Sequence, residues 1–129
     1  MNRRRCLQTI AGSALVPALA SGDTTNPIQL HIELEVDPAK EAELAINFRN
    51  HFRPAIRKQR GFLDVKLLKM RKTLAGKLDG NWSYKLVLTF KTEEEREAWA
   101  KTDDHQKAWP TIAGTLTGRR IRVILYDVV

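Results

Sequence analysis

The chain has 129 residues, which is enough for one domain built around a single hydrophobic core. It carries 22 Lys and Arg residues against 15 Asp and Glu residues, a formal net charge of +7, and one cysteine, Cys6. The sequence contains no phosphate-binding loop or dinucleotide fingerprint, and its three histidines are too dispersed for a recognisable metal motif. We therefore predict neither a cofactor nor a metal.

The first twenty residues resemble a bacterial twin-arginine export signal. Residues 3–7, Arg-Arg-Arg-Cys-Leu, precede an apolar run that ends in the small-x-small sequence of residues 18–20. Cleavage after Ala20 would remove the cysteine and leave 19 basic against 15 acidic residues, a net charge of +4, which argues against a nucleic-acid partner. No later run is apolar enough to cross a bilayer, so we predict a periplasmic or extracellular protein without stable membrane association. The alternative is a flexible basic tail.

The domain is expected to span residues 28–129, after a flexible lead-in at residues 21–27. Residues 28–36 alternate apolar and polar without a fault, which predicts a strand buried on one face. Asp37 and Pro38 then supply a helix cap and a first-turn proline, and apolar residues at helical spacing predict a helix to about Gln59. Pro54 is expected to kink or weaken its last turns.

The second half of the chain repeats this order. Strands are predicted at 62–70 and 82–90, joined by a polar connection, and a capping box of Thr92 and Glu95 begins a second helical region. That region is expected to break near residues 102–104, to be strained at Pro110 and to end at Gly118, before a last strand over 120–129. The order βαββαβ favours a ferredoxin-like α+β fold, an antiparallel sheet with both helices on one face.

The strand patterns divide the residues between two faces of the sheet. The helix-covered face is predicted to hold Ile28, Leu30, Ile32, Leu34, Leu86, Leu88, Val123 and Leu125. The other face is predicted to hold His31, Glu33, Glu35, Lys85, Thr89, Arg120, Arg122 and Tyr126. With the first strand between the third and fourth, the two glutamates would meet the cations across strands. Such a face is either solvated or covered by a second subunit.

The chain resembles the antibiotic-biosynthesis-monooxygenase-like family of dimeric α+β barrels over about residues 28–129. The resemblance depends on the element order, on Arg60-Gly61-Phe62, and on Trp99 followed by residues 105–109, His-Gln-Lys-Ala-Trp. It implies a homodimer whose sheets pair face to face through the polar face. The activities it implies are cofactor-free oxygenation of phenols and quinols, and haem degradation.

Haem degradation itself is disfavoured. Trp99 matches a tryptophan of the haem-degrading branch, but Trp109 stands where that branch has its haem-ligating histidine. The branch also has an asparagine in the first strand, and residues 28–36 contain none. Haem binding without degradation remains an alternative.

His105 is the candidate catalytic base, because a partly buried imidazole near pH 7 can remove a phenolic proton. The alternative is a histidine that caps the helix break or is satisfied in the core. Asn47 and His51, one turn apart, could hydrogen-bond a ligand between helix and sheet, or simply form a polar flank. Aromatic side chains could line a pocket for a small aromatic ligand, or belong to the core: Trp82, Tyr84, Trp99 and Trp109.

The sequence thus predicts an exported homodimer that oxidises a small aromatic or quinol with oxygen and without a metal. The competing prediction is a non-catalytic binding or stress-related module on the same scaffold. That module would have side chains filling the space around His105 and His51.

Overall fold

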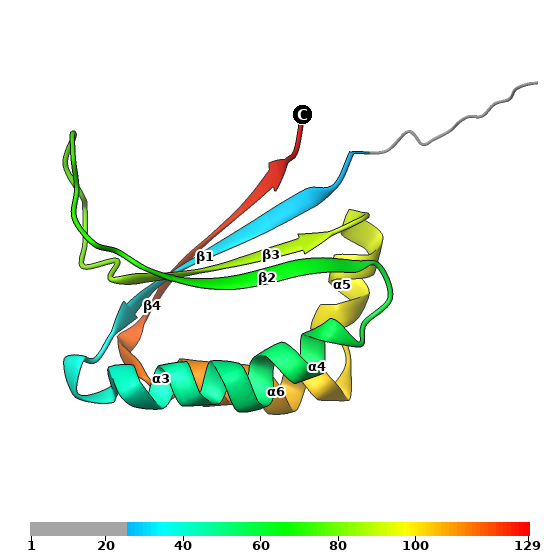
Figure 1. Ribbon diagram of the computed structural model, residues 1–129, viewed down its shortest axis with the longest axis horizontal. Helices are drawn as coiled ribbons and strands as arrows, with labels where there is room; N and C mark the ends of the chain where they lie inside the picture. The colour runs from blue at the N-terminus through cyan, green and yellow to red at the C-terminus, as the bar shows by residue number, and fades with distance from the viewer. Residues whose placement is uncertain (1–25) are drawn as a thin grey trace, which may run out of the picture.

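The computed structural model describes residues 26–129, the side chain of Arg119 excepted (Figure 1). The predicted export signal, the cleavage site after Ala20 and most of the lead-in lie outside the described residues. The elements, in chain order, are β1 (Ile28–Val36), η3 (Pro38–Lys40), α3 (Glu41–Asn47), η4 (Phe48–Phe52), α4 (Arg53–Arg57), β2 (Phe62–Lys69), β3 (Tyr84–Phe90), α5 (Glu93–Ala100), α6 (Asp103–Ala113) and β4 (Leu116–Asp127).

The four strands form one antiparallel sheet in the order β2-β3-β1-β4. All helices lie on one face of this sheet, and the opposite face is open (Figure 1). The predicted ferredoxin-like arrangement is therefore confirmed, including the position of the first strand between the third and the fourth. Because β2 and β4 are the edges, their side chains receive less cover than those of β1 and β3.

The first helical region accommodates Pro54 because it changes from α-helical to π-helical hydrogen bonding just before this residue. Asp37 caps its start by accepting a hydrogen bond from the backbone N–H of Ala39, as predicted. The middle stretch η4 is π-helical, and the N–H of Arg53 donates to the carbonyl of Phe48, five residues earlier. A proline ring clashes with the carbonyl four residues before it. The wider π turn immediately before Pro54 allows the helix to continue to Arg57.

The second helical region is two helices, as expected, but it ends earlier than predicted. Thr92 caps α5 by accepting from the N–H of Glu95, and Thr102 caps α6 by accepting from the N–H of His105. Helix α6 ends at Ala113 and β4 begins at Leu116, four residues before the predicted strand start. Gly118 is not a helix stop but lies within β4, where its φ of 65° suits glycine.

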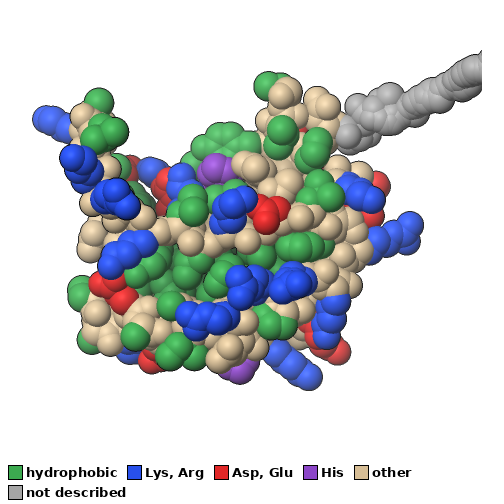
Figure 2. Space-filling view, in the orientation of Figure 1, with side chains coloured by type: hydrophobic (Ala, Val, Ile, Leu, Met, Phe, Trp, Pro, Cys, Tyr) green, Lys and Arg blue, Asp and Glu red, His purple; other side chains and the backbone are tan. Residues whose placement is uncertain are grey.

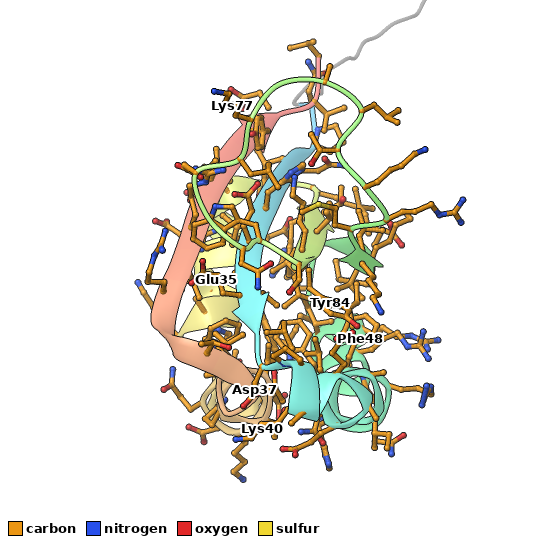
Figure 3. All side chains as sticks on the ribbon, turned by 90° about the vertical axis from the view of Figure 1, so that its left-hand side faces the viewer. Glu35, Asp37, Lys40, Phe48, Lys77 and Tyr84 are labelled. Carbon is orange, nitrogen blue, oxygen red and sulfur yellow. The ribbon has the colours of Figure 1, made fainter. Side chains whose placement is uncertain are left out.

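The core lies between the sheet and the helices. Its fully buried large side chains come from both layers: Leu34, Leu86, Leu88 and Phe90 from the sheet, and Leu44, Phe52, Ile56, Trp99 and Ile112 from the helices. Figure 3 shows Phe48 and Tyr84 at one end of this space.

Two residues predicted for the core are not covered. In the register, Val123 pairs with Ile32 and Leu125 pairs with Leu30, so both lie on the helix side of the sheet. They are nevertheless 49% and 45% exposed. Their strand is an edge, and α6 packs only near its beginning, at Leu116, so the burial prediction for this part of β4 was wrong.

Trp82 precedes β3 rather than beginning it, although a strand was predicted from residue 82. The indole packs against the guanidinium groups of Arg120 and Arg122, 5.0 Å and 5.2 Å from its ring centroid. Its N–H donates to Asp79 over 2.8 Å.

Candidate functional site

The predicted base His105 contacts one of the predicted pocket residues, Trp99. Their ring centroids are 5.0 Å apart and the rings meet edge to face. Trp99 in turn packs edge to face on Phe52, with centroids 5.8 Å apart, which fixes the indole between the two helical segments. The break between α5 and α6 creates this contact because it turns α6 back, so that its first turn lies over the end of α5.

The imidazole of His105 is held neutral near pH 7. Burial is the main cause that lowers its pKa below the ordinary value, and the positive charge of Arg96 lowers it further. Arg96 is itself fixed by a bidentate pair with Glu93. The Nδ1 atom of His105 is buried without a hydrogen-bond partner among the described residues. A buried, unpaired ring nitrogen of this kind can accept a proton from a ligand that reaches it.

A depression of about 420 Å³ adjoins this pair. Trp99 and Thr102 form one wall, and the other walls come from the end of the first helix and the start of α5: Gln59, Arg60, Thr92, Glu94, Glu95 and Ala98. Its size suits one aromatic ring system. His105 does not line it directly, but its ring contacts that of Trp99, which does.

The other predicted pocket residues are not brought to this place. Asn47 donates to the carbonyl of Thr111 over 2.9 Å and thereby ties α3 to α6. His51 is exposed and lines a shallow groove between the two helices. Trp109 lies at a separate depression beside the start of β4. Tyr84 lies at the opposite end of the core from α5.

Tyr84 is part of a small polar cluster at the end of β3. Its hydroxyl donates to Glu41 over 2.7 Å, and Lys69 lies 2.9 Å from the same carboxylate oxygen. The hydrogen bond from Tyr84, followed by that from Lys69, lowers the pKa of Glu41, while burial raises the pKa of the phenol. Both groups therefore keep their usual charge states at neutral pH. We assign this cluster a structural role, since it joins the start of α3 to the sheet.

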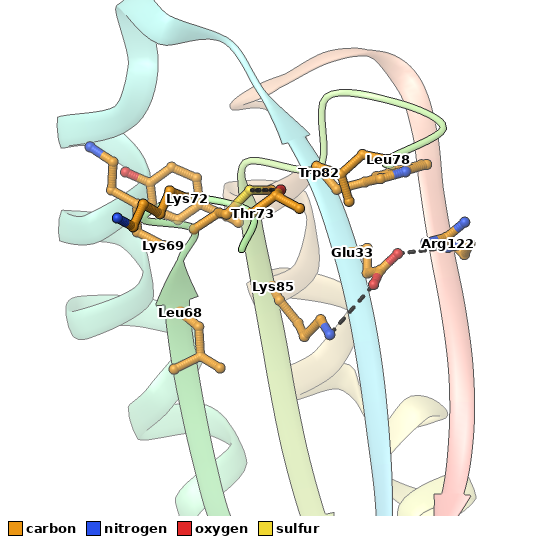
Figure 4. Close-up of a pocket in the computed structure, with 11 residues that line it drawn as sticks. Glu33, Leu68, Lys69, Lys72, Thr73, Leu78, Trp82, Lys85 and Arg122 are labelled. Atoms are coloured by element: carbon orange, nitrogen blue, oxygen red, sulfur yellow. Dashed lines mark hydrogen bonds and ion pairs between the residues drawn. The ribbon is translucent and has the colours of Figure 1, made fainter. Parts of the chain in front are cut away.

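The open face carries the predicted ion pairs. Glu33, only 14% exposed, lies between Lys85 at 3.4 Å and Arg122 at 2.6 Å, its cross-strand neighbours in the register (Figure 4). Glu35 pairs with Arg120 at 3.4 Å. These contacts confirm the predicted charge pairing across the three strands.

The connection between β2 and β3 bounds a second depression on the open face (Figure 4). Its volume is about 380 Å³, and its lining includes Trp82, Tyr84, Leu68, Met70 and Leu78 as well as the Glu33 ion-pair group. The sequence did not predict this site because the connection is polar and irregular, and only its folded course brings it over the strands.

His31 occupies the middle of the open face. Its ring lies 4.4 Å from that of Tyr126, its Nε2 is 3.0 Å from Gln29, and its Nδ1 is buried without a partner among the described residues. Burial, followed by the charge of Lys85, lowers its pKa. Val87, beside it, is 8% exposed although no helix covers this face. The centre of the open face is therefore apolar and aromatic, with charges around it.

Two general observations limit the kinds of site. Within residues 26–129, no three His, Cys, Asp or Glu side chains gather in a way that could hold a metal ion. In the same part of the chain, no helix combines the length and apolarity needed to cross a membrane.

The strand order and the helix layer define a ferredoxin-like α+β protein, and the comparisons agree. The chain belongs to the antibiotic biosynthesis monooxygenase family, whose model matches residues 27–110. Proteins of this family are typically dimeric. No curated protein matches the chain.

Solved structures share the fold at low sequence identity. A candidate antibiotic biosynthesis monooxygenase from Caulobacter crescentus is 20% identical, with a TM-score of 0.66 over 81% of this chain and 92% of its own. A dimeric ferredoxin-like protein of unknown function from Jannaschia is 14% identical, with a TM-score of 0.67 over 79% and 99%. SnoaB, a cofactor-independent oxygenase from Streptomyces nogalater, is 15% identical, with a TM-score of 0.63 over 81% and 94%.

Proposed function

We propose that this protein is a homodimeric, cofactor-independent oxygenase of a small phenol or quinol, with His105 as its base. Family membership supports the reaction class. The observation that carries the residue assignment is the buried, unpartnered Nδ1 of His105, on a ring whose lowered pKa keeps it neutral. A neutral imidazole beside an aromatic wall is suited to deprotonate a phenol.

The reaction needs only the substrate, oxygen and a base. The phenolic proton moves to His105, and the resulting phenolate reduces O2 and combines with it to give a ring peroxide anion. This anion takes the proton back from His105 and becomes a hydroperoxide. The O–O bond then breaks, and the departing hydroxide leaves as water with the hydrogen of the same ring carbon. The product is a quinone that keeps one oxygen atom of O2. The substrate ring would sit in the adjoining depression, which Trp99 and Thr102 line.

Oxygen consumption in the presence of a panel of phenols and quinols tests this proposal. We expect His105→Asn to lower kcat at least about 100-fold, the contribution typical of general base catalysis. His51→Asn is the matched control, because it removes an exposed histidine from the helix groove, and it should leave kcat unchanged. Equal rates in both variants and the parent would exclude His105 as the base.

We further propose that the homodimer forms through the open face. Val87, His31 and Tyr126 give this face an apolar and aromatic centre, and the ion pairs of Glu33 keep its charges compensated when water is excluded. Light scattering tests the arrangement. Val87→Glu should yield monomers, whereas Ile46→Glu, which places the same charge on exposed α3, should remain dimeric.

A second candidate function is small-ligand binding without catalysis. The depression of about 380 Å³ beneath the β2–β3 connection favours it, because aromatic, apolar and cationic side chains meet there. Tight binding of an aromatic acid without oxygen consumption would support this module. Haem binding would appear as a Soret band on titration with haem.

Export by the twin-arginine route is also part of the proposal, supported by residues 3–20 of the sequence. Changing Arg3, Arg4 and Arg5 to lysine should abolish export while leaving the folded domain unchanged. Export of this variant at the parent's level would contradict the proposed route.

A further inference from the structure

The connection between β2 and β3 forms a projecting arm, defined here as residues 70–83. It rises from the sheet on the side away from the helices (Figure 1). Near its tip Leu74 is 85% exposed, and Leu78, which also lines the depression on the open face, is 50% exposed. Gly76 lies between them with a φ of 80°, and nothing lies within 4 Å of the place a side chain would occupy. The tip is therefore a narrow turn that presents apolar side chains to the surroundings.

Cations flank these leucines. Arg71, Lys72 and Lys77 are exposed and make no ion pair with another described residue, whereas Lys66 and Lys69 pair with Asp64 and Glu41. Figure 3 shows Lys77 on the arm, far from the helices. The positive charge at the tip is thus uncompensated within the described part of the molecule.

The arm belongs to a larger basic region. Residues 44–78 contain ten Lys and Arg residues and one acidic residue, Asp64. On the face shown in Figure 2, where β2 forms the sheet edge, Lys and Arg side chains gather on the arm and along the gap between sheet and helices. The basic residues are therefore concentrated in residues 44–78, so this segment is more strongly basic than the net charge of the whole chain indicates.

The base of the arm is fixed although its tip is open. The N–H of Met70 donates to the carbonyl of Ser83 over 2.8 Å, and the N–H of Asn81 donates to Glu35 over 2.9 Å. Asp79 accepts from Trp82 and pairs with Arg122. Both ends of the arm are therefore fixed to the sheet, and Thr73 and Leu78 near the tip line the depression on the open face.

We propose that the tip of this arm docks on a bilayer surface rich in anionic lipids. Leucines set between cations fit the headgroup boundary, where the apolar side chains enter and the cations remain with the phosphates. A nucleic acid would use the cations but not the leucines, and residues 70–79 contain no aromatic side chain on which a base could stack. This reversible surface binding departs from the membrane prediction made from the sequence, and it does not depend on the proposed oxygenase reaction.

Co-sedimentation with vesicles tests the proposal. The full chain should bind vesicles that contain 30 mole per cent phosphatidylglycerol, bind weakly to pure phosphatidylcholine, and dissociate as salt is raised. The triple variant Arg71→Ala, Lys72→Ala, Lys77→Ala should lower the partition coefficient about 100-fold, and Leu74→Ala about tenfold. The matched control replaces Lys91, Lys101 and Lys107, exposed cations of the helical layer, and should change binding less than threefold.

A local reporter separates the arm from the basic N-terminal segment. Leu74→Trp should show a blue shift of the added tryptophan emission with anionic vesicles, both in the full chain and in a chain that begins at Ser21. Circular dichroism checks that every variant is folded.

Four results would overturn the proposal. The first is equal loss of binding in the two triple variants, and the second is the absence of the blue shift. The third is a charge-dependent binding to heparin or DNA that exceeds vesicle binding and ignores Leu74, which would indicate a polyanion partner. Conversion of the dimer to a monomer by the arm variants, with vesicle binding unchanged, would instead assign the arm to the subunit contact.

Discussion

The two faces of the sheet stabilise their buried side chains in different ways. On the helix side, Leu34, Leu86 and Phe90 are fully buried, and the imidazole of His105, which contacts Trp99, is neutral near pH 7. On the open side, the Glu33 side chain is 14% exposed and is held by two cations. On the helix side the buried side chains are uncharged, whereas on the open side a charged side chain is buried only because it is paired with opposite charges. The first arrangement suits deprotonation of an apolar aromatic, and the second suits a subunit contact.

The largest difference between the faces should appear in core truncations. Leu86→Ala on the helix side should reduce the free energy of unfolding by about 2–5 kcal/mol, since it opens a cavity in a packed core. Leu67 is the register partner of Leu86 on β2, and the next residue, Leu68, lies on the open side with 45% exposure. Leu68→Ala should therefore reduce the free energy of unfolding by less than about 1 kcal/mol. Urea denaturation measures both. Equal losses would mean that the open face is as tightly covered as the core.

Removing the central carboxylate tests the open face directly. Glu33→Gln should reduce the free energy of unfolding by about 1–2 kcal/mol, because it unpairs Lys85 and removes one of the two carboxylates that Arg122 contacts. Both cations are exposed enough to regain some hydration. Glu35→Gln is the matched control, because its partner Arg120 is more exposed, and it should cost less. Chemical denaturation at low and high salt measures both variants. An identical loss of unfolding free energy in the two variants would contradict a larger contribution from Glu33 than from Glu35.

On the helix side, the N-cap residue Thr102 should affect both the stability of the protein and the titration of His105. Thr102→Ala removes the hydroxyl that accepts from the N–H of His105 and should cost about 1 kcal/mol. Thr92→Ala, the equivalent cap of α5, should cost a similar amount. Only Thr102→Ala should shift the NMR titration of His105. A shift of equal size in the Thr92 variant would show that the cap does not set this ring.

The smallest effect is the dependence of stability on pH, to which one histidine on each face contributes. Burial is the largest cause of the lowered folded pKa in both His105 and His31. Between that folded pKa and the unfolded value near 6.5, the unfolded chain binds more protons, so stability rises with pH. The contribution is complete above pH 6.5 and is lost as pH falls below it.

Urea unfolding between pH 5 and pH 8 measures this dependence. His105→Gln and His31→Gln should each flatten part of it, and His51→Gln, on an exposed side chain, should leave it unchanged. A steeper dependence in either of the first two variants would reverse the assigned sign.

Much of the architecture follows from local patterns. The perfect alternation over residues 28–36 gives β1, and the Thr92 and Glu95 pair begins α5 where the capping box predicts. These signals work because strand and helix periods differ and because a cap satisfies exposed backbone N–H groups within a few residues. The charge pairs of the open face also follow, once the strand order is known. Of the candidate site, only the contact between Trp99 and His105 joins two predicted residues.

By itself, the sequence determined the element order, the fold class and which side of each regular strand is apolar, because these depend on neighbours along the chain. Only the tertiary structure decided how far each side chain is covered. It left Val123 and Leu125 exposed on an edge strand and turned Trp82 onto the arginines of β4. It also brought Lys and Arg side chains together on the face that Figure 2 shows. Burial, ion pairing and surface potential are sums over segments distant in sequence, so no local pattern could have supplied them.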